Sequence, residues 1–359
     1  MRFWYGVSGL AVLLSACAVS DVEAEPLPET AALAESERVA TAWTFDGNRD
    51  AIAEMSCQDP PSDDESEQFF YQAEEIAPTD KATFDARLDG MSLAGIWVLE
   101  SPRQAFGGLS GLVADESGAL IAVSDQGQFV SLPMDRETGA PAEMGRMAPM
   151  RGPDGAPLSG KSQGDAEGLA LRDGVAFVSF ERDHRVSAFD LEGCRGAAQE
   201  VVLARLNRTL AGVALPDNRG PEGLAILPDG TLRIGIEARE TGAAVSGTMM
   251  TDGTLGNVVE TTPPAFQLLT GLDHRDGLMA TVYRAYDPVR GNRISFTVAR
   301  GTALVASGTL KPPEPVDNIE GIALGPLNDG KRRLWLISDD NFNPRQRTLL
   351  FAFDLDANR

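Results

Sequence analysis

The chain repeats one short pattern five times: an apolar run, a turn that contains glycine, and a second apolar run. Consecutive turn glycines lie 47 to 56 residues apart. Hairpins at that spacing, each followed by one or two further strand-like runs, are typical of four-stranded propeller blades. The turn glycines are Gly118, Gly174, Gly230, Gly277 and Gly330.

These repeats predict an all-β fold, a β-propeller of five four-stranded blades. A sixth blade within the irregular stretches between the hairpins stays an alternative. A chain of 359 residues with 37 Gly and 22 Pro suits such a turn-rich fold. The last hairpin is followed by only one further strand, TLLFAFDL, and the run LAGIWVLE precedes the first hairpin. We therefore expect the N- and C-terminal strands to pair and close the ring, which leaves no free sheet edge there.

Charged residues recur at one end of these hairpins. Glu167 lies seven residues before Gly174, and Glu181 lies seven residues after it. Because the two strand ends opposite a hairpin turn lie together, these carboxylates should be neighbours. The fourth hairpin has Leu269 or Thr270 where the others have a polar or acidic residue. The other matching positions hold Ser110, Asp125, Glu222, Glu237, Arg284, Glu320, Asp339 and Asp340.

If the hairpins are the inner strands, the acids converge at one mouth of the central channel. Converging carboxylates repel one another unless a cation compensates them, and Ca²⁺ accepts six to eight oxygen ligands. The alternative is that each acid caps a strand end or binds backbone amides of the next blade. The metal-ligand candidates are Asp165, Glu167, Glu222, Glu237, Glu320 and Asp339, with Asp125 and Asp340 as weaker ones.

Four further side chains are candidates for catalysis. Arg284 and Lys161 would bind an anionic group of the substrate, and a salt bridge to a ring acid is the alternative for Arg284. His184, next to Glu181, is the candidate general acid, and a surface-loop position is the alternative for it. Glu181 is a candidate both for catalysis and for metal ligation.

The N-terminus, MRFWYGVSGLAVLLSAC, predicts an exported protein. Its apolar run is too short to span a bilayer, and LSAC resembles a bacterial lipoprotein cleavage box. We expect a signal peptide at 1–16, a lipid on Cys17, an acidic tether at 17–35 and a partly disordered extension at 36–86. The propeller would follow at 87–359. The expected location is the cell envelope, on an outer membrane facing the periplasm, with a secreted or soluble periplasmic protein as the alternative.

Charge and cysteines add further limits. The net charge of −22 lacks the basic footprint that nucleic-acid binding needs, and no obligate protein partner is evident. Cys57 and Cys194 could form a disulfide in an exported protein, but their separation in sequence leaves this open.

The motifs GGLSGL, PLSGKSQGDAEGLAL, VSFERDHR, RAYDPVRGNRI and LWLISDDNFNPRQRTLLFAFDL resemble the bacterial phytase-like family described as having esterase-like activity of phytase. The resemblance covers residues 88–357. It implies an envelope or secreted β-propeller that hydrolyses phosphoesters or esters, and it assigns no individual catalytic residue.

The leading functional hypothesis is a Ca²⁺-assisted phosphoester hydrolase that acts on a small anionic ester. A serine esterase fits less well, because Ser110 lacks the G-x-S-x-G elbow and the chain has only two histidines. A lactonase on the same scaffold and a ligand-binding propeller without catalysis also stay open.

Overall fold

The computed structural model describes residues 40–58, 65–135, 138–237, 242–264, 266–327 and 330–356. Residues 40–359 form one compact unit. The predicted signal peptide, Cys17 and the tether lie outside the described residues. Within the described ranges, no helix has the length and apolar character needed to cross a membrane.

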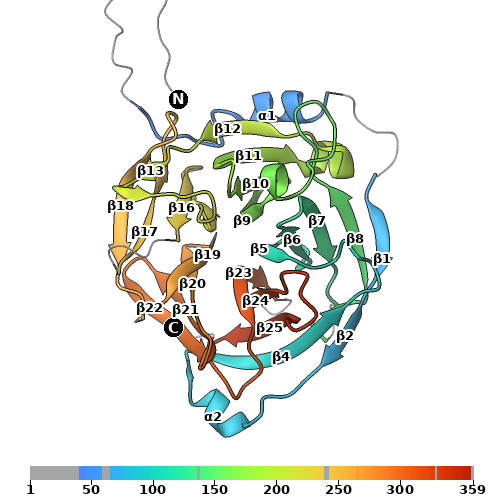
Figure 1. Ribbon diagram of the computed structural model, residues 1–359, viewed down its shortest axis with the longest axis vertical. Helices are drawn as coiled ribbons and strands as arrows, with labels where there is room; N and C mark the ends of the chain where they lie inside the picture. Colours follow the sequence, from blue (N-terminus) through green and yellow to red (C-terminus); the bar gives the residue numbers. More distant parts are fainter. Residues whose placement is uncertain are drawn as a thin grey trace, which may run out of the picture. The chain divides into compact units, whose positions relative to one another are not determined.

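Five antiparallel sheets surround a central axis as the blades of a propeller, which confirms the predicted fold class (Figure 1). From the axis outwards, blade 1 contains β5 (Leu109–Ala114), β6 (Leu120–Ser124), β7 (Gln128–Leu132), β8 (Met144–Pro149) and β1 (Glu67–Phe70). Blade 2 contains β9 (Ala166–Arg172), β10 (Val175–Phe180), β11 (Arg185–Asp190) and β12 (Val201–Arg205). Blade 3 contains β15 (Gly223–Ile226), β16 (Leu232–Ile236), β17 (Ala244–Met249) and β18 (Leu255–Thr261).

Blade 4 contains β19 (Leu268–Arg275), β20 (Leu278–Asp287), β21 (Gly291–Arg300), β22 (Ala303–Leu310) and β3 (Leu88–Asp89). Blade 5 contains β23 (Asn318–Pro326), β24 (Arg332–Asp339), β25 (Thr348–Leu355), β4 (Met91–Glu100) and β2 (Gln72–Glu75). A small ribbon, β13 (Thr209–Leu210) and β14 (Val213–Ala214), lies between blades 2 and 3 in the chain. The helices are α1 (Arg49–Ser56), α2 (Lys81–Asp85), α3 (Lys161–Gly164), α4 (Leu191–Cys194) and the 3₁₀ turn η1 (Arg195–Ala197).

The predicted ring closure is present, because β4 pairs with β25 in the last blade. The five turn glycines all have positive φ, between 73° and 85°, as tight hairpin turns require. The expectation of four strands in every blade was wrong for three of them. Segments of the N-terminal extension and of the residues that follow it add a fifth strand to blades 1, 4 and 5 and cover edges that would otherwise stay unpaired.

Five apolar clusters fill the spaces between neighbouring blades. The N-terminal extension also contributes to them, because Trp43 and Phe45 pack edge-on against Phe177 of blade 2. A disulfide between Cys57, after α1, and Cys194, in α4, fixes this part of the extension to blade 2. The pairing that the sequence left open is therefore formed.

The inner strands approach one another at five residue–glycine pairs, one per blade. A Cβ added to Gly111, Gly168, Gly271 or Gly321 would lie 2.4 to 2.9 Å from a carbonyl oxygen of the next inner strand. At Gly223 it would lie 2.7 Å from Leu272 of the next blade. Only glycine permits this closeness, so these positions set how tightly the ring closes.

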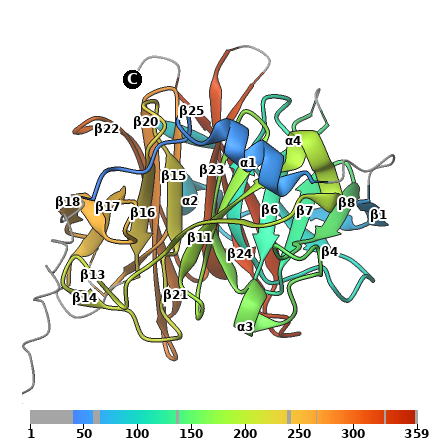
Figure 2. The ribbon, with the colours of Figure 1, turned by 90° about the horizontal axis from the view of Figure 1, so that it is seen from above.

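The end of the channel near the hairpin turns is crossed by a side chain. Arg275 of blade 4 donates to the Ala114 carbonyl oxygen of blade 1 and also pairs with Glu116. Blades 4 and 1 are not neighbours, so Arg275 spans the axis there. The opposite end of the channel carries α3 and lies lower in Figure 2. Acidic side chains gather at that end, because Lys161 of α3 pairs with both Asp125 and Asp165.

We predict that Gly321→Ala lowers the free energy of unfolding by about 1–3 kcal/mol, because the new methyl group overlaps the Ser110 carbonyl oxygen. Gly47→Ala is the matched control. Its nearest neighbour would be the Thr44 hydroxyl at 3.3 Å, and a change below about 1 kcal/mol is expected. Urea unfolding measures both, and equal effects would contradict the role given to the inner-strand glycines.

The disulfide gives a second prediction. It closes a loop of 137 residues, so its loss should cost about 2–4 kcal/mol of stability, mainly by freeing the unfolded chain. The double variant Cys57→Ser/Cys194→Ser and the wild-type protein in dithiothreitol should unfold at the same lower urea concentration. An unchanged midpoint would show that the bond does not constrain the chain.

Candidate functional site

Two rings of side chains surround the channel at the end opposite the turns. The inner ring consists of the residue that precedes each inner-strand glycine: Ser110, Glu167, Glu222, Thr270 and Glu320. In four blades the strand register shifts at this residue, which marks a bulge in the inner strand. A bulge changes where a side chain points, so the repeat delivers five side chains to one opening.

The outer ring comes from the second strand of each hairpin and consists of Asp125, Glu181, Glu237, Arg284 and Asp339. In each blade, the outer-ring residue lies across the hairpin from the residue that comes two positions before the inner-ring residue in the sequence. The backbone N–H of Glu181, for example, donates to the Asp165 carbonyl oxygen at 2.8 Å. In blade 5 the residue opposite Asp339 is Asn318.

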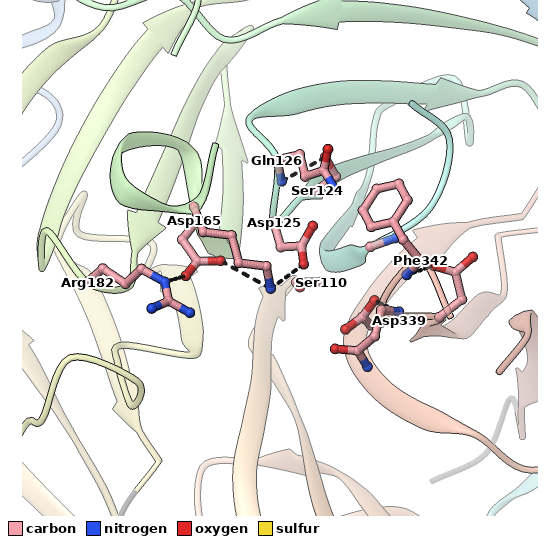
Figure 3. A network of polar contacts seen from close by, with 12 residues as sticks. Ser110, Ser124, Asp125, Gln126, Asp165, Arg182, Asp339 and Phe342 are labelled. Carbon is pink, nitrogen blue, oxygen red and sulfur yellow. Dashed lines mark hydrogen bonds and ion pairs between the residues drawn. The ribbon is translucent and has the colours of Figure 1, made fainter. Parts of the chain in front are cut away.

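Blade 2 brings three carboxylates together. Ligand oxygens of Asp165, Glu167 and Glu181 all lie within 4.8 Å of one another, so this cluster could hold a metal ion. Asp165 is 1% exposed, and Arg182 donates to its Oδ2 atom (Figure 3). Its Oδ1 atom is buried without a hydrogen-bond partner in the described part of the chain. The predicted neighbourhood of Glu167 and Glu181 is therefore confirmed.

A lysine lies beside this cluster. Lys161 of α3 places its ammonium group 2.6 Å from Asp125 and 3.9 Å from Asp165. Figure 3 labels these two acids, which come from neighbouring blades. Lys161, proposed from the sequence to bind substrate, is here paired with two buried acids.

The two acids of blade 5, Glu320 and Asp339, accept hydrogen bonds from protein groups. Glu320 accepts from Asn318 at 2.9 Å and from the Ser110 hydroxyl at 3.2 Å, and it pairs with Arg284 at 3.2 Å. Asp339 accepts from the Asn341 N–H at 2.6 Å and from Asn318 at 3.3 Å. The Asn341 N–H caps Asp339 at the end of β24, as the alternative predicted. The donors to Glu320 are side chains and not backbone amides of the next blade, and the salt bridge expected as the alternative for Arg284 is formed.

Crowding of carboxylates raises several pKa values. Burial, and then the charge of Asp165, raise the pKa of Glu181 to about 8, and burial with Glu320 raises that of Asp339 to about 8. Burial raises the pKa of Glu167 well above its usual range, and Glu222 and Glu320 add to the effect. The pKa of Glu222 rises for the same reasons, with Glu237 as the main charged neighbour. These groups need a proton or a cation at neutral pH.

Two hollows meet at Arg284 and Tyr286, which line both. The apolar hollow, of about 650 Å³, is also lined by Pro263, Phe266, Leu268 and, at its acidic side, Glu237. The amide hollow, of about 690 Å³, is also lined by Glu320, Arg345 and a set of carboxamide side chains: Asn292, Asn318, Asn341, Asn343 and Gln346.

The charged groups that act most strongly on the two histidines are not members of the acidic rings. His184 is 5% exposed, and the charged groups that act on it are Arg208, Asp217 and Asp183. His274 lies beside the hairpin turn of blade 4, at the other end of the channel.

Asp340 accepts hydrogen bonds from the backbone N–H groups of Gly108 and Phe342 and from the Thr348 hydroxyl, which is a structural role.

Sequence reasoning missed some residues of the site. Asn318 could have been found, because it occupies the position of Asp165 two places before the inner-ring residue. Phe266, Tyr286 and Asn292 carry no repeat signal, since they lie in connections and outer strand ends that differ between blades.

Fold and site together define a five-bladed β-propeller with an acidic channel mouth. The profile of the phytase-like family, described as esterase-like activity of phytase, matches residues 104–260 and 279–342. The chain belongs to this family. A search of curated proteins finds no match.

Solved structures show distant likenesses. The PQQ-bound aldose sugar dehydrogenase from Streptomyces coelicolor is 14% identical over 72% of this chain and 97% of that chain, with a TM-score of 0.41. Glutaminyl cyclase from Myxococcus xanthus is 14% identical over 69% and 91%, with a TM-score of 0.38. A protein of unknown function from Dyadobacter fermentans is 11% identical over 82% and 97%, with a TM-score of 0.41. None of these likenesses bears on the activity of this chain.

The raised pKa of Glu181 predicts how stability depends on pH. The unfolded chain loses this proton near pH 4.5, whereas the folded protein keeps it up to about pH 8. The protonated Glu181 side chain therefore contributes fully to the free energy of unfolding below pH 4.5. This contribution is lost as the pH rises through 8. In a chelator, the urea midpoint of the wild-type protein should fall between pH 5 and 8 more steeply than that of Glu181→Gln. Parallel profiles would contradict the shift.

Proposed function

We propose that this protein is a metal-dependent hydrolase of phosphoesters and that the reaction takes place at the acidic mouth of the channel. The observation that carries the proposal is the convergence of Asp165, Glu167 and Glu181 in a ring that also contains Arg284. Family membership supports ester hydrolysis as the reaction class.

The blade 2 cluster fits a divalent cation such as Ca²⁺, which prefers carboxylate oxygens. The Oδ1 atom of Asp165 supports this, because it accepts no hydrogen bond from the described residues and has the Lys161 ammonium group only at 3.9 Å, and a buried carboxylate oxygen without a hydrogen-bond donor is costly. Asp165, Glu167 and Glu181 would hold the ion, and Glu222 is a further candidate. Of the two roles that the sequence left open for Glu181, this assignment takes the role of metal ligand. Glu320 and Asp339 take positioning roles.

A bound cation would orient the ester and lower the pKa of a water molecule. Arg284 would bind the anionic oxygens of the substrate, and Glu320 holds its guanidinium in place at 3.2 Å. Glu237 lines the apolar hollow beside Arg284 and is half-buried, so it can reach a substrate and accept a proton. Lys161 compensates Asp125 and Asp165 before the cation binds.

A serine-esterase mechanism has less support. The Ser110 hydroxyl donates to Glu320 and is 2% exposed, and His274 lies at the other end of the channel. Lactones and carboxylic esters stay as alternative substrates of the same site. Arg284 favours an anionic one.

We also propose an envelope location with a lipid on Cys17. The support is the N-terminal sequence and the Cys57–Cys194 disulfide, which suits an oxidising compartment.

Glu167→Gln should lower kcat/KM for p-nitrophenyl phosphate on the order of 100-fold or more, because it removes a cation ligand. A chelator should abolish turnover of the wild-type protein, and added Ca²⁺ should restore it. Glu192→Gln, an exposed glutamate at the turn end, is the control and should keep full activity. Undiminished turnover in the chelator would exclude the metal role, and no turnover of any ester would favour a binding protein.

A further inference from the structure

The two hollows beside Arg284 indicate which class of phosphoester the site takes. This inference rests on the proposed function. We propose that the site takes a phosphodiester whose two organic groups differ, one flat and apolar and the other rich in hydroxyl groups. The phosphoryl group would lie at Arg284, with one organic group in each hollow.

The apolar hollow has the chemistry of an aromatic or aliphatic subsite. Phe266 is 88% exposed and Tyr286 is 66% exposed, and both line this hollow. Large aromatic side chains at a cavity mouth are costly to leave in water and are typical of ligand contact.

The amide hollow has the chemistry of a polyol subsite. Its carboxamides each offer donors and an acceptor, which matches hydroxyl groups that both donate and accept. The Oδ1 atom of Asn292 is buried and has no hydrogen-bond partner among the described residues. Asn292 also lines this hollow, so its carboxamide group can contact a hydroxyl group of the ligand.

The position of Arg284 on the lining of both hollows favours a phosphodiester over a phosphomonoester. Arg284 belongs to both hollows, and its Nε atom has no acceptor in the described part of the chain. A phosphomonoester has one organic group and would leave one hollow filled only by water. A phosphodiester has an anionic centre with two organic groups, so it can occupy both of the hollows that share Arg284.

The reaction balances with water as the only co-reactant. The water oxygen bonds to phosphorus, and the bond from phosphorus to one ester oxygen breaks. That oxygen leaves as an alcohol after gaining a proton, and the other organic group stays on the phosphomonoester product.

Titration calorimetry with the full chain and Ca²⁺ tests the inference with three probes: phenyl phosphate, diphenyl phosphate and phenyl glyceryl phosphate. Phenyl glyceryl phosphate should bind about tenfold or more tighter than phenyl phosphate, since it fills both hollows. Phe266→Ala should weaken all three probes about tenfold. Asn292→Ala should weaken phenyl glyceryl phosphate alone. Val289→Ala, 93% exposed at the tip of the same hairpin, should change none.

Equal affinity for monoester and diester, no binding of either, or an Asn292→Ala variant that weakens every probe equally would overturn the inference. Turnover of p-nitrophenyl phosphate tests the proposed function separately. A chain that hydrolyses this monoester but binds the three probes equally would keep the hydrolase proposal and lose the diester one. The expected binding pattern without any turnover would do the reverse.

Discussion

The close approach of the five inner strands is the constraint on which the rest of the structure depends. A residue followed by glycine occurs at the same level in every blade. Because glycine has no Cβ atom, each inner strand can lie directly against the next one. A Cβ atom added to Gly321, for example, would lie only 2.4 Å from the Ser110 carbonyl oxygen. A ring closed this tightly leaves the preceding residue facing the channel. The same five dipeptides therefore set both the packing of the propeller and the composition of its mouth.

That geometry forces acidic side chains together, and the protein resolves the repulsion in two ways. On the side of blades 4 and 5, Arg284, Asn318 and Ser110 supply donors to Glu320. On the side of blade 2, Arg182 and Lys161 reach Asp165 but leave one of its oxygens without a hydrogen bond. The first side is a structural network, and the second has the features of a cation site. The proposed chemistry uses both, because an anionic ester needs the arginine of one side and the cation of the other.

The repeat made the fold and much of the site predictable from the sequence. Turn glycines fix the hairpins, and strand alternation fixes which ends meet, so the neighbourhood of Glu167 and Glu181 followed without coordinates. Contacts that cross between elements did not follow. Lys161 pairs with Asp125 because α3 sits over blade 1, and no local pattern shows this. His184 is buried, so the surface-loop alternative was wrong, and its role as a general acid stays a prediction because closeness in sequence to Glu181 does not fix the direction of a side chain after the turn. The fifth strands of blades 1, 4 and 5 depend on tertiary pairing, which short runs such as QFFYQAEEI cannot indicate.

The most direct test is anomalous diffraction from crystals of the protein grown with Ca²⁺. Bound Ca²⁺ should give a peak bounded by oxygens of Asp165, Glu167 and Glu181, with the Lys161 ammonium group moved away from Asp165. A crystal at millimolar Ca²⁺ with no peak at the channel mouth, and with Lys161 still bridging Asp125 and Asp165, would contradict the proposed cation site.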